Sequence, residues 1–523
     1  MSRQRIIRAA GLILLTGIVL SFITLKFSES VSDGDIWFHL AYGKYFFENH
    51  TLIPDHTVFS WTPAENKTIY CAWIPEVVFY LLHSSGGEYA FYVLRYLFVL
   101  TFLVLVLSFL RKDKFGSLPA LLFIVLIGLL MSYAGLRIKA EIFSFIMMTF
   151  MVWAWLWIKM KKNDAGQLFY LFPFLILIWV NSHGGFIFGL VFLALLLAGE
   201  MLNRFVGSSE CLDDRAMRHL IISMVMSVFA VFITPYGIQY PLQLFHNLVV
   251  DSVEFKRHLD TIAEYQTIFF PEASQLHFVW YLIISSGILL IQFFFRFKAR
   301  KIDWALVLVN AAFMVLYIRF LRATYFWAII YTMSAAYMIG EMGRDEFGLV
   351  LKKSFKGPFN YWMAFLVIFT SMFSFYEFFC TPGVGNNVNY ISPVSEAGYI
   401  SKNFSSKKIG NDYYCGSYLL WSLWPSKKIF IDARYFPYSA WYEDVSQFED
   451  SQDRDEIEAV LRKYESDVWC LSYTTPVFQY FLTSPDWRLV YYGPSACVFK
   501  SNKNDKTTYV RSHSESIYSV NIY

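Results

Sequence analysis

The sequence predicts an α-helical polytopic membrane protein with about eleven spans, ending in a small extracytoplasmic α/β domain. Hydrophobic residues make up 56% of the 523 residues and charged residues only 16%, whereas soluble domains carry about 25% charged residues. The mean hydropathy is +0.42. Long apolar stretches follow one another up to about residue 384, and each approaches the roughly 20 residues that a helix needs to cross a bilayer.

Eleven apolar stretches are predicted to be transmembrane helices. They are residues 8–27, 88–110, 117–135, 139–160, 168–181, 185–203, 219–235, 276–296, 302–318, 321–341 and 359–379. A further apolar segment, 73–84, is too short to cross and is interpreted as an interfacial helix. No small-residue cleavage pattern follows the first stretch, so it is interpreted as an uncleaved anchor rather than a signal peptide.

Basic residues orient these helices, because loops on the cytoplasmic side are enriched in Lys and Arg. With eleven spans, one side carries roughly twenty basic residues in its short loops and the other roughly eight. Arg3, Arg5 and Arg8 precede the first span and lie on the richer side. We therefore expect the N-terminus in the cytoplasm and the C-terminal region outside.

The C-terminal region differs from the rest of the chain, because its charge density rises and its apolar runs shorten. Four short runs read as buried strands and two amphipathic segments as helices. The strands are 428–432, 468–472, 488–492 and 496–499, and the helices are 393–404 and 453–464. This alternation predicts a small α/β domain with a largely parallel sheet. The predicted organisation is a transmembrane domain (1–384) with a first outer loop (28–72), an α/β domain (385–503) and a polar tail (504–523).

Ionisable and polar residues gather on the predicted outer face. Such residues are costly near hydrocarbon and mark functional sites. They are Asp33, Asp35 and His39 in the first loop, Arg137, Lys139 and Glu141 before the fourth span, Asn181 and His183 before the sixth, Glu264 in a long loop, and Arg319 and Arg322 before the tenth. A positive-inside bias does not predict these outer cations, so they require a functional reason.

A sugar linked to a membrane-embedded polyprenyl phosphate suits this set of residues. Basic side chains bind phosphate, and Arg does so in a bidentate way, so we expect donor-phosphate binding by Arg137, Lys139, Arg319 and Arg322. Asp33 or Asp35 is the expected catalytic base toward an acceptor hydroxyl. Alternatively, this pair holds a divalent cation such as Mg or Mn. A single displacement would invert the anomeric configuration, and His39, Asn181, His183 and Glu264 are the expected substrate contacts.

Several stretches resemble a known family. They are DGDIWFHLAYGK (33–44), IPDHTVFSW (53–61), WVNSHGG (179–185), NDYYCGSYLLW (411–421) and FIDAR (430–434). In this order, they resemble a largely uncharacterised bacterial group of the GT-C integral membrane glycosyltransferases. The resemblance implies a GT-C-like fold, a polyprenyl-phosphate-linked donor and an essential first-loop aspartate. Together with the predicted orientation, we expect a protein that acts at the periplasmic face of a bacterial inner membrane. Ala140 stands where the family suggests an Arg-Pro turn, which leaves open whether Arg137 or Lys139 faces the site.

Each functional reading has an alternative. Asp33 and Asp35 are also suited to cap a helix, and Asn181 and His183 to satisfy backbone groups at a helix break. Arg319 and Arg322 are equally suited to reach outer lipid phosphates. A transporter or flippase for lipid-linked sugars and a non-catalytic scaffold are the rival functions. Transport predicts polar groups at mid-membrane on broken helices, whereas these residues cluster at one face.

Overall fold

The structure, a computed structural model, divides into two units. Unit 1 comprises Met1–Pro54 and Thr68–Asn389, and unit 2 comprises Asp55–Lys67 and Tyr390–Tyr523. The residues described are 3–29, 31, 33–66, 69–110, 118–162, 164–249, 263–269, 276–341, 392–434, 436–438 and 441–503. The predicted span 359–379 and the tail 504–523 therefore lie outside the described residues.

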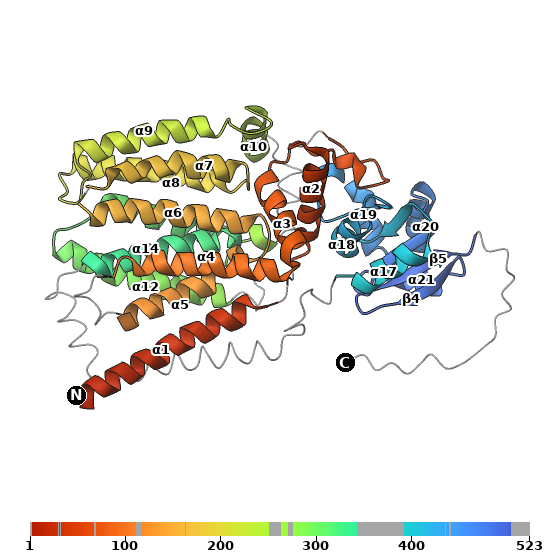
Figure 1. The fold of residues 1–523 in the computed structure, drawn as a ribbon, viewed down its shortest axis with the longest axis horizontal. Helices are drawn as coiled ribbons and strands as arrows, with labels where there is room; N and C mark the ends of the chain where they lie inside the picture. The colour runs from red at the N-terminus through yellow and green to blue at the C-terminus, as the bar shows by residue number, and fades with distance from the viewer. Residues whose placement is uncertain are drawn as a thin grey trace. The chain divides into compact units, whose positions relative to one another are not determined.

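Unit 1 is a bundle of helices that lie side by side (Figure 1). They are α1 (Arg3–Phe27), α4 (Tyr89–Leu107), α5 (Leu118–Ser132), α6 (Glu141–Met160), α7 (Leu171–Val180), α8 (Phe186–Phe205), α9 (Asp214–Ala230), α12 (Leu276–Lys298), α13 (Trp304–Arg319) and α14 (Thr324–Glu341). Each overlaps one predicted span. Among the described residues, α4, α6, α8 and α12 are long and apolar enough to cross a membrane. The total of eleven crossings stays a prediction.

Two helices form the centre of the bundle. Every residue of α14 from Thr324 to Gly340 is buried, and so are most residues of α6. A helix that is apolar all round is buried in this way. Gly128 of α5 lets α14 approach closely, because a Cβ at this glycine would lie 2.0 Å from Thr332 Oγ1.

Three shorter helices lie at one end of the bundle (Figure 1). They are α2 (Asp35–Asn49), α3 (Trp73–Gly86), which contains the predicted short helix 73–84, and α10 (Gln239–Val249). Helices α2 and α3 pack so closely that a Cβ at Gly43 would lie 2.1 Å from the Glu76 carbonyl oxygen. The close packing fixes α2, which begins at Asp35, two residues after Asp33.

A buried ion network joins the other end of α6 to α8 and α13. Lys159 Nζ lies 2.5 Å from Glu200 Oε1 and 2.8 Å from Asp303 Oδ2. Asn203 Nδ2 donates to Asp303 Oδ1 at 2.8 Å, and Asp303 also caps the start of α13. All four side chains are buried. The network therefore holds α6 and α13 together at one end of the bundle. Their other ends, Glu141 of α6 and Arg319 of α13, lie at the opposite end of the bundle.

Unit 2 contains a five-stranded mixed sheet in the order β2-β1-β3-β5-β4. The strands are β1 (Lys408–Asn411), β2 (Lys428–Ile429), β3 (Val468–Ser472), β4 (Trp487–Tyr492) and β5 (Ala496–Ser501). Strands β2, β1 and β3 are parallel, whereas β5 is antiparallel to β3 and β4. The prediction of a largely parallel sheet was therefore wrong for the half of the sheet that contains β5 and β4. Only three residues join β4 to β5, and a parallel pair needs a much longer crossover.

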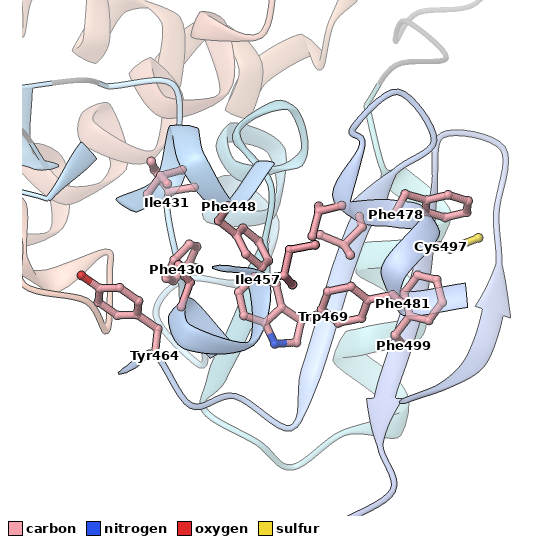
Figure 2. Packing of buried hydrophobic residues seen from close by; sticks show 14 of the residues in the cluster. Phe430, Ile431, Phe448, Ile457, Tyr464, Trp469, Phe478, Phe481, Cys497 and Phe499 are labelled. Carbon is pink, nitrogen blue, oxygen red and sulfur yellow. The ribbon is translucent and has the colours of Figure 1, made fainter. Parts of the chain in front are cut away.

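The helices of unit 2 pack around an aromatic core. They are α17 (Val394–Asn403), α18 (Tyr413–Leu423), α19 (Tyr442–Asp450), α20 (Arg454–Lys463) and α21 (Val477–Thr483). The Trp469 ring on β3 lies 5.2 Å from the Phe430 ring, 5.1 Å from Phe448 and 5.7 Å from Phe481 (Figure 2). Such aromatic contacts contribute beyond the area that they bury.

The segment Asp55–Lys67 belongs to unit 2, although it lies between α2 and α3 in the sequence. Ser60 forms a parallel β-bridge with Ile429 of β2, and the Trp61 N–H donates to the Ile429 carbonyl at 3.1 Å. Trp441 Nε1 donates to the Pro63 carbonyl at 2.7 Å. The first loop thus adds a short extended segment beside the edge strand β2.

We predict that Lys159→Met destabilises the protein. The variant leaves the buried carboxylates of Glu200 and Asp303 without their shared ammonium group, which costs about 3–5 kcal/mol for a buried pair. Thermal unfolding of the purified protein in detergent measures the effect. Lys161→Met, at an exposed position of the same turn, is the matched control, and equal melting temperatures for the two variants would contradict the prediction.

Candidate functional site

Asp33 and Asp35 lie together where α2 begins. Asp35 is the first residue of the helix, and its N–H donates to Asp33 Oδ1 at 3.2 Å. A helix N-terminus favours negative charge, and Asp33 accepts the N–H of the first helical residue, although the N-cap position itself is Gly34. The backbone bond holds the two carboxyl groups beside each other.

Lys139 brings three acids together from distant parts of unit 1. Its Nζ lies 3.5 Å from Asp33 Oδ2, 3.5 Å from Glu141 Oε2 and 3.2 Å from Glu264 Oε1. Lys139 itself is buried. A buried ammonium group needs such partners, because desolvation without pairing is costly.

Arg322 connects to the same acids from the other side. Its guanidinium forms an ion pair with Glu141 and lies 3.9 Å from Glu264 Oε2. Its Nη1 donates to Tyr265 Oη at 2.8 Å. We call Asp33, Asp35, Lys139, Glu141, Glu264 and Arg322 the acid cluster. Its members come from the start of α2, the turn before α6, the first residue of α6 and two short 3-10 helices, η5 (Ala263–Tyr265) and η7 (Leu321–Ala323).

His183 borders the acid cluster from the connection between α7 and α8. Its Nε2 lies 3.1 Å from Arg322 Nη2 and 3.9 Å from Glu141 Oε1, and its Nδ1 lies 2.7 Å from Ser144 Oγ. Burial lowers the pKa of His183 to about 3, although Glu141 acts in the opposite direction. The ring is therefore neutral and can accept a hydrogen bond from Arg322.

Acids outnumber cations in the acid cluster. Burial, and next the charge of Asp33, raise the pKa of Asp35 from 3.8 to about 7, while Lys139 acts to lower it. Desolvation and a neighbouring like charge both disfavour the ionised carboxyl group. Asp35 is therefore poised to exchange a proton near neutral pH, which is the property that a general base requires.

His39 and Asn181 lie beside the site but are held by protein groups. His39 Nδ1 lies 3.2 Å from Glu76 Oε1, and burial, followed by the charge of His183, lowers its pKa to about 3. Asn181 Nδ2 donates to the carbonyls of Leu177 and Ile233, and its Oδ1 accepts from Trp73 Nε1. For Asn181, this arrangement favours the alternative of a partner at a helix break.

Arg137 points to a different group of residues. Its guanidinium lies 5.9 Å from the Tyr133 ring centroid, and Tyr133 Oη donates to Glu29. Glu29 Oε1 also accepts from Lys26 Nζ at 2.6 Å. Arg95 Nη1 donates to the Phe27 carbonyl at 2.9 Å. We call Lys26, Arg95 and Arg137 the cation cluster, with Glu29 as its acid.

The cation cluster retains unused donors. The Nε atoms of Arg95 and Arg137 are buried and make no hydrogen bond within the part of the chain that the structure describes. The Lys139 N–H donates to the Arg137 carbonyl at 2.9 Å, so the two clusters are neighbours. Of the two basic residues that the sequence left open, Lys139 faces the acid cluster and Arg137 the cation cluster.

The remaining predicted cation, Arg319, lies at the last residue of α13. Its side chain is exposed, and its guanidinium lies 5.5 Å from the Phe320 ring centroid. The contacts that define the acid cluster do not include it. This position is compatible with the alternative of reaching toward lipid phosphates.

Sequence reasoning did not select several residues that the structure brings to the site. Glu141 is among the ionisable residues predicted on the outer face, but the sequence assigns it no role; in the structure it links Lys139 to Arg322. Arg95 lies inside the predicted span 88–110, and an arginine within such a span is itself a signal of function. Lys26 and Glu29 are ordinary residues at the end of a helix, and only their neighbours make them notable.

A divalent cation stays a prediction for Asp33 and Asp35. Within the described ranges, no three His, Cys, Asp or Glu side chains are grouped as a metal site. Lys139 Nζ already lies 3.5 Å from the Asp33 carboxylate. The positive charge that the paired acids need thus comes from a side chain of the protein.

Comparison with known proteins shows a shared fold. No family model matches the chain, and no curated protein matches it in sequence. Its structure is similar to GT-C glycosyltransferases. One of them is the archaeal oligosaccharyltransferase AglB from Archaeoglobus fulgidus, in complex with an inhibitory peptide and a dolichol-phosphate. The TM-score is 0.53 and the identity 13%, and the match covers 89% of this chain and 69% of AglB. It is also similar to ArnT from Cupriavidus metallidurans. For the apo state the TM-score is 0.54 and the identity 11%, and the match covers 94% of this chain and 98% of ArnT. For ArnT bound to undecaprenyl phosphate the TM-score is 0.51 and the identity 10%, and the match covers 93% of this chain and 97% of ArnT. The predicted GT-C resemblance is thus confirmed at the level of the fold.

We predict that Asp35→Asn becomes more stabilising as the pH rises. Because the folded-state pKa of Asp35 is about 7 and its ordinary value 3.8, the parent protein loses stability as the pH rises from about 4 to about 7. Asn imitates the protonated carboxyl group and avoids this loss. Melting temperatures at pH 4 to pH 8 should show a growing advantage for the variant.

The exposed Asp164→Asn provides the matched control for this comparison, since its melting temperature should differ from the parent by the same amount at every pH. An Asp35→Asn difference that stays constant over the same range would refute the raised pKa.

Proposed function

We propose that the protein is an inverting glycosyltransferase that moves a sugar from a polyprenyl-phosphate donor to a lipid, glycan or protein acceptor. The observation that carries this proposal is the acid cluster, in which paired carboxyl groups meet the buried Lys139 and the partly exposed Arg322 at one end of a helical bundle. The fold is shared with proteins whose structures hold dolichol-phosphate and undecaprenyl phosphate, which supports the donor class.

The reaction assigned to the acid cluster is a single displacement. As the acceptor oxygen forms its bond to the anomeric carbon, its proton passes to the carboxylate of Asp35 or Asp33. The bond between the anomeric carbon and the phosphate oxygen breaks, and the polyprenyl phosphate leaves with the electron pair. Because there is one displacement and no covalent intermediate, the configuration inverts.

The cation cluster is the better candidate for the donor phosphate. Lys26, Arg95 and Arg137 have one acid among them, Glu29, whereas Lys139 and Arg322 are already paired with Asp33, Glu141 and Glu264. Buried Nε–H groups of Arg95 and Arg137 make no other hydrogen bond that the structure describes, and charge-assisted bonds from guanidinium to phosphate are strong. Lys139 and Arg322 then orient the acids next to the reacting carbon.

The proposed setting is a bacterial inner membrane with about eleven spans. The N-terminus would lie in the cytoplasm, and the acid cluster and unit 2 at the periplasmic face, as the distribution of basic residues predicts. The donor would reach the site from the bilayer with its phosphate at the outer interface.

Transport and a silent scaffold are less well supported. The acid cluster is built at helix ends and in connections rather than on broken helices at mid-bundle, where a transporter would place its polar groups. A scaffold gives no reason to retain two neighbouring, largely desolvated carboxyl groups, since placing like charges together away from water is costly.

We predict that replacing both Asp33 and Asp35 by Asn abolishes transfer while the protein still inserts and folds. Loss of a general base lowers the rate by about 10²- to 10⁴-fold. Glycans and lipid-linked sugars of a strain carrying the double variant, measured by mass spectrometry, should match those of a deletion strain. Glu48→Gln, on the same helix but outside the acid cluster, is the control. Full transfer by the double variant would remove the catalytic assignment.

We predict that Arg137→Gln weakens the use of the donor more than the chemical step. Loss of one charge-assisted hydrogen bond should raise the donor KM by about tenfold or more, with a smaller change in kcat. Steady-state kinetics with the donor identified from the deletion strain measure both constants. Arg204→Gln, on an exposed helix end, is the control, and an unchanged donor KM in Arg137→Gln would exclude the residue from phosphate binding. The same assay applied to Arg319→Gln tests the sequence-based prediction that Arg319 binds the donor phosphate.

A further inference from the structure

Unit 2 contains a cleft that the proposed chemistry does not use. It has a volume of about 520 Å³ and is bounded by the start of α20, by α21 and by the loop after β3. Ligand pockets usually have volumes of about 300–1,000 Å³. The cleft is therefore large enough for a small organic ligand, and every residue that lines it belongs to unit 2.

Uncharged polar groups dominate the walls of this cleft. Nine of its thirteen lining residues carry a hydroxyl or amide group, three are aromatic (two of these are tyrosines), and Arg454 alone among them is charged at neutral pH. Arg454 Nε is already paired with Glu458 Oε1 at 2.7 Å. A phosphorylated or acidic ligand would find little free positive charge here, because anion sites rely on unpaired Arg or Lys groups.

The amides of Gln452 and Gln479 are the most adaptable polar groups of the cleft. Both residues are exposed, and within the described part of unit 2 their side chains make no hydrogen bond. Each amide offers two donors and an acceptor, which suits a ligand rich in hydroxyl groups. Nearby, Tyr473 and Tyr480 supply aromatic rings, and Tyr473 is 37% exposed.

An extended peptide is not favoured as the occupant. Peptides that add to a sheet need an exposed edge strand. The strand that leads into the cleft is β3, which lies between β1 and β5 in the sheet. Aromatic faces combined with neutral hydrogen-bonding groups instead match sugar rings, which have apolar C–H faces and hydroxyl rims.

We propose that this cleft binds a short, uncharged oligosaccharide, which serves as part of the acceptor. The role of this oligosaccharide as part of the acceptor rests on the proposed function, whereas its binding to the cleft does not. Tyr480 and Tyr473 would stack against sugar rings, while Gln452 and Gln479 would hydrogen-bond with their hydroxyl groups. The cleft would thus select the acceptor by its glycan portion, separately from the acid cluster.

Binding of neutral trisaccharides to the full-length protein in lipid nanodiscs tests this proposal. Maltotriose, cellotriose and tri-N-acetylchitotriose serve as probes, and penta-serine serves as a hydroxyl-rich peptide comparison. Saturation-transfer NMR titrations should detect at least one trisaccharide. Tyr480→Ala and Gln479→Leu should each weaken its binding by about five- to tenfold, while Tyr414→Ala, an exposed tyrosine of α18 outside the cleft, should not.

Gln479→Leu changes an exposed residue and keeps the test decisive where Tyr480→Ala fails to fold. Absence of trisaccharide binding, equal binding by the cleft variants and the parent, or equal binding of penta-serine would each overturn the proposal. The Asp33→Asn, Asp35→Asn double variant should bind the trisaccharide as the parent does. If the parent protein binds the trisaccharide but has no transferase activity, the proposed function is overturned and the oligosaccharide site remains.

Discussion

The ammonium group of Lys139 is the interaction on which the rest of the site depends. It is buried within 3.5 Å of Asp33, Glu141 and Glu264, three acids that like-charge repulsion would otherwise separate. Glu141 and Glu264 extend this arrangement to Arg322, and Arg322 reaches His183. Because each buried charge needs the next one, the connection before α6, the start of α2, η5 and η7 are held together as one polar group.

Charge is divided between two neighbouring groups rather than balanced within one. The acid cluster has more carboxyl groups than cations, and burial, followed by the charge of Asp33, raises the pKa of Asp35, whereas the cation cluster has three basic residues and one acid. In the sequence, one residue, Ile138, lies between Arg137 of the cation cluster and Lys139 of the acid cluster. Proton transfer benefits from an excess of carboxylate, and phosphate binding benefits from an excess of guanidinium. Because the two clusters are separate, one protein can supply both an excess of carboxylate for proton transfer and an excess of guanidinium for phosphate binding.

The rigid parts of the bundle support this arrangement from a distance. The buried network around Lys159 fixes the ends of α6 and α13 opposite the acid cluster, and the close contact of Gly43 with Glu76 fixes α2 on α3. The loop after α2 contributes Asp55–Lys67 to unit 2. The chain segment that carries the paired acids is therefore directly continuous with the unit that contains the oligosaccharide cleft.

The sequence by itself determined the long helices of unit 1, four of the five strands and most residues of the candidate site, because apolar length and outlying charges are local signals; it missed β1 and the helices α18, α19 and α21. It identified Asp33, Asp35, Lys139, His183, Glu264 and Arg322. Only the tertiary structure decided which charges meet: Lys139 rather than Arg137 faces the acids, Glu141 links the two cations, and Arg319 stays exposed. It also decided that β5 runs antiparallel and that residues 55–67 join unit 2. Which charged side chains pair across more than a hundred residues of sequence depends on how helices and strands pack. A local sequence pattern does not contain this information.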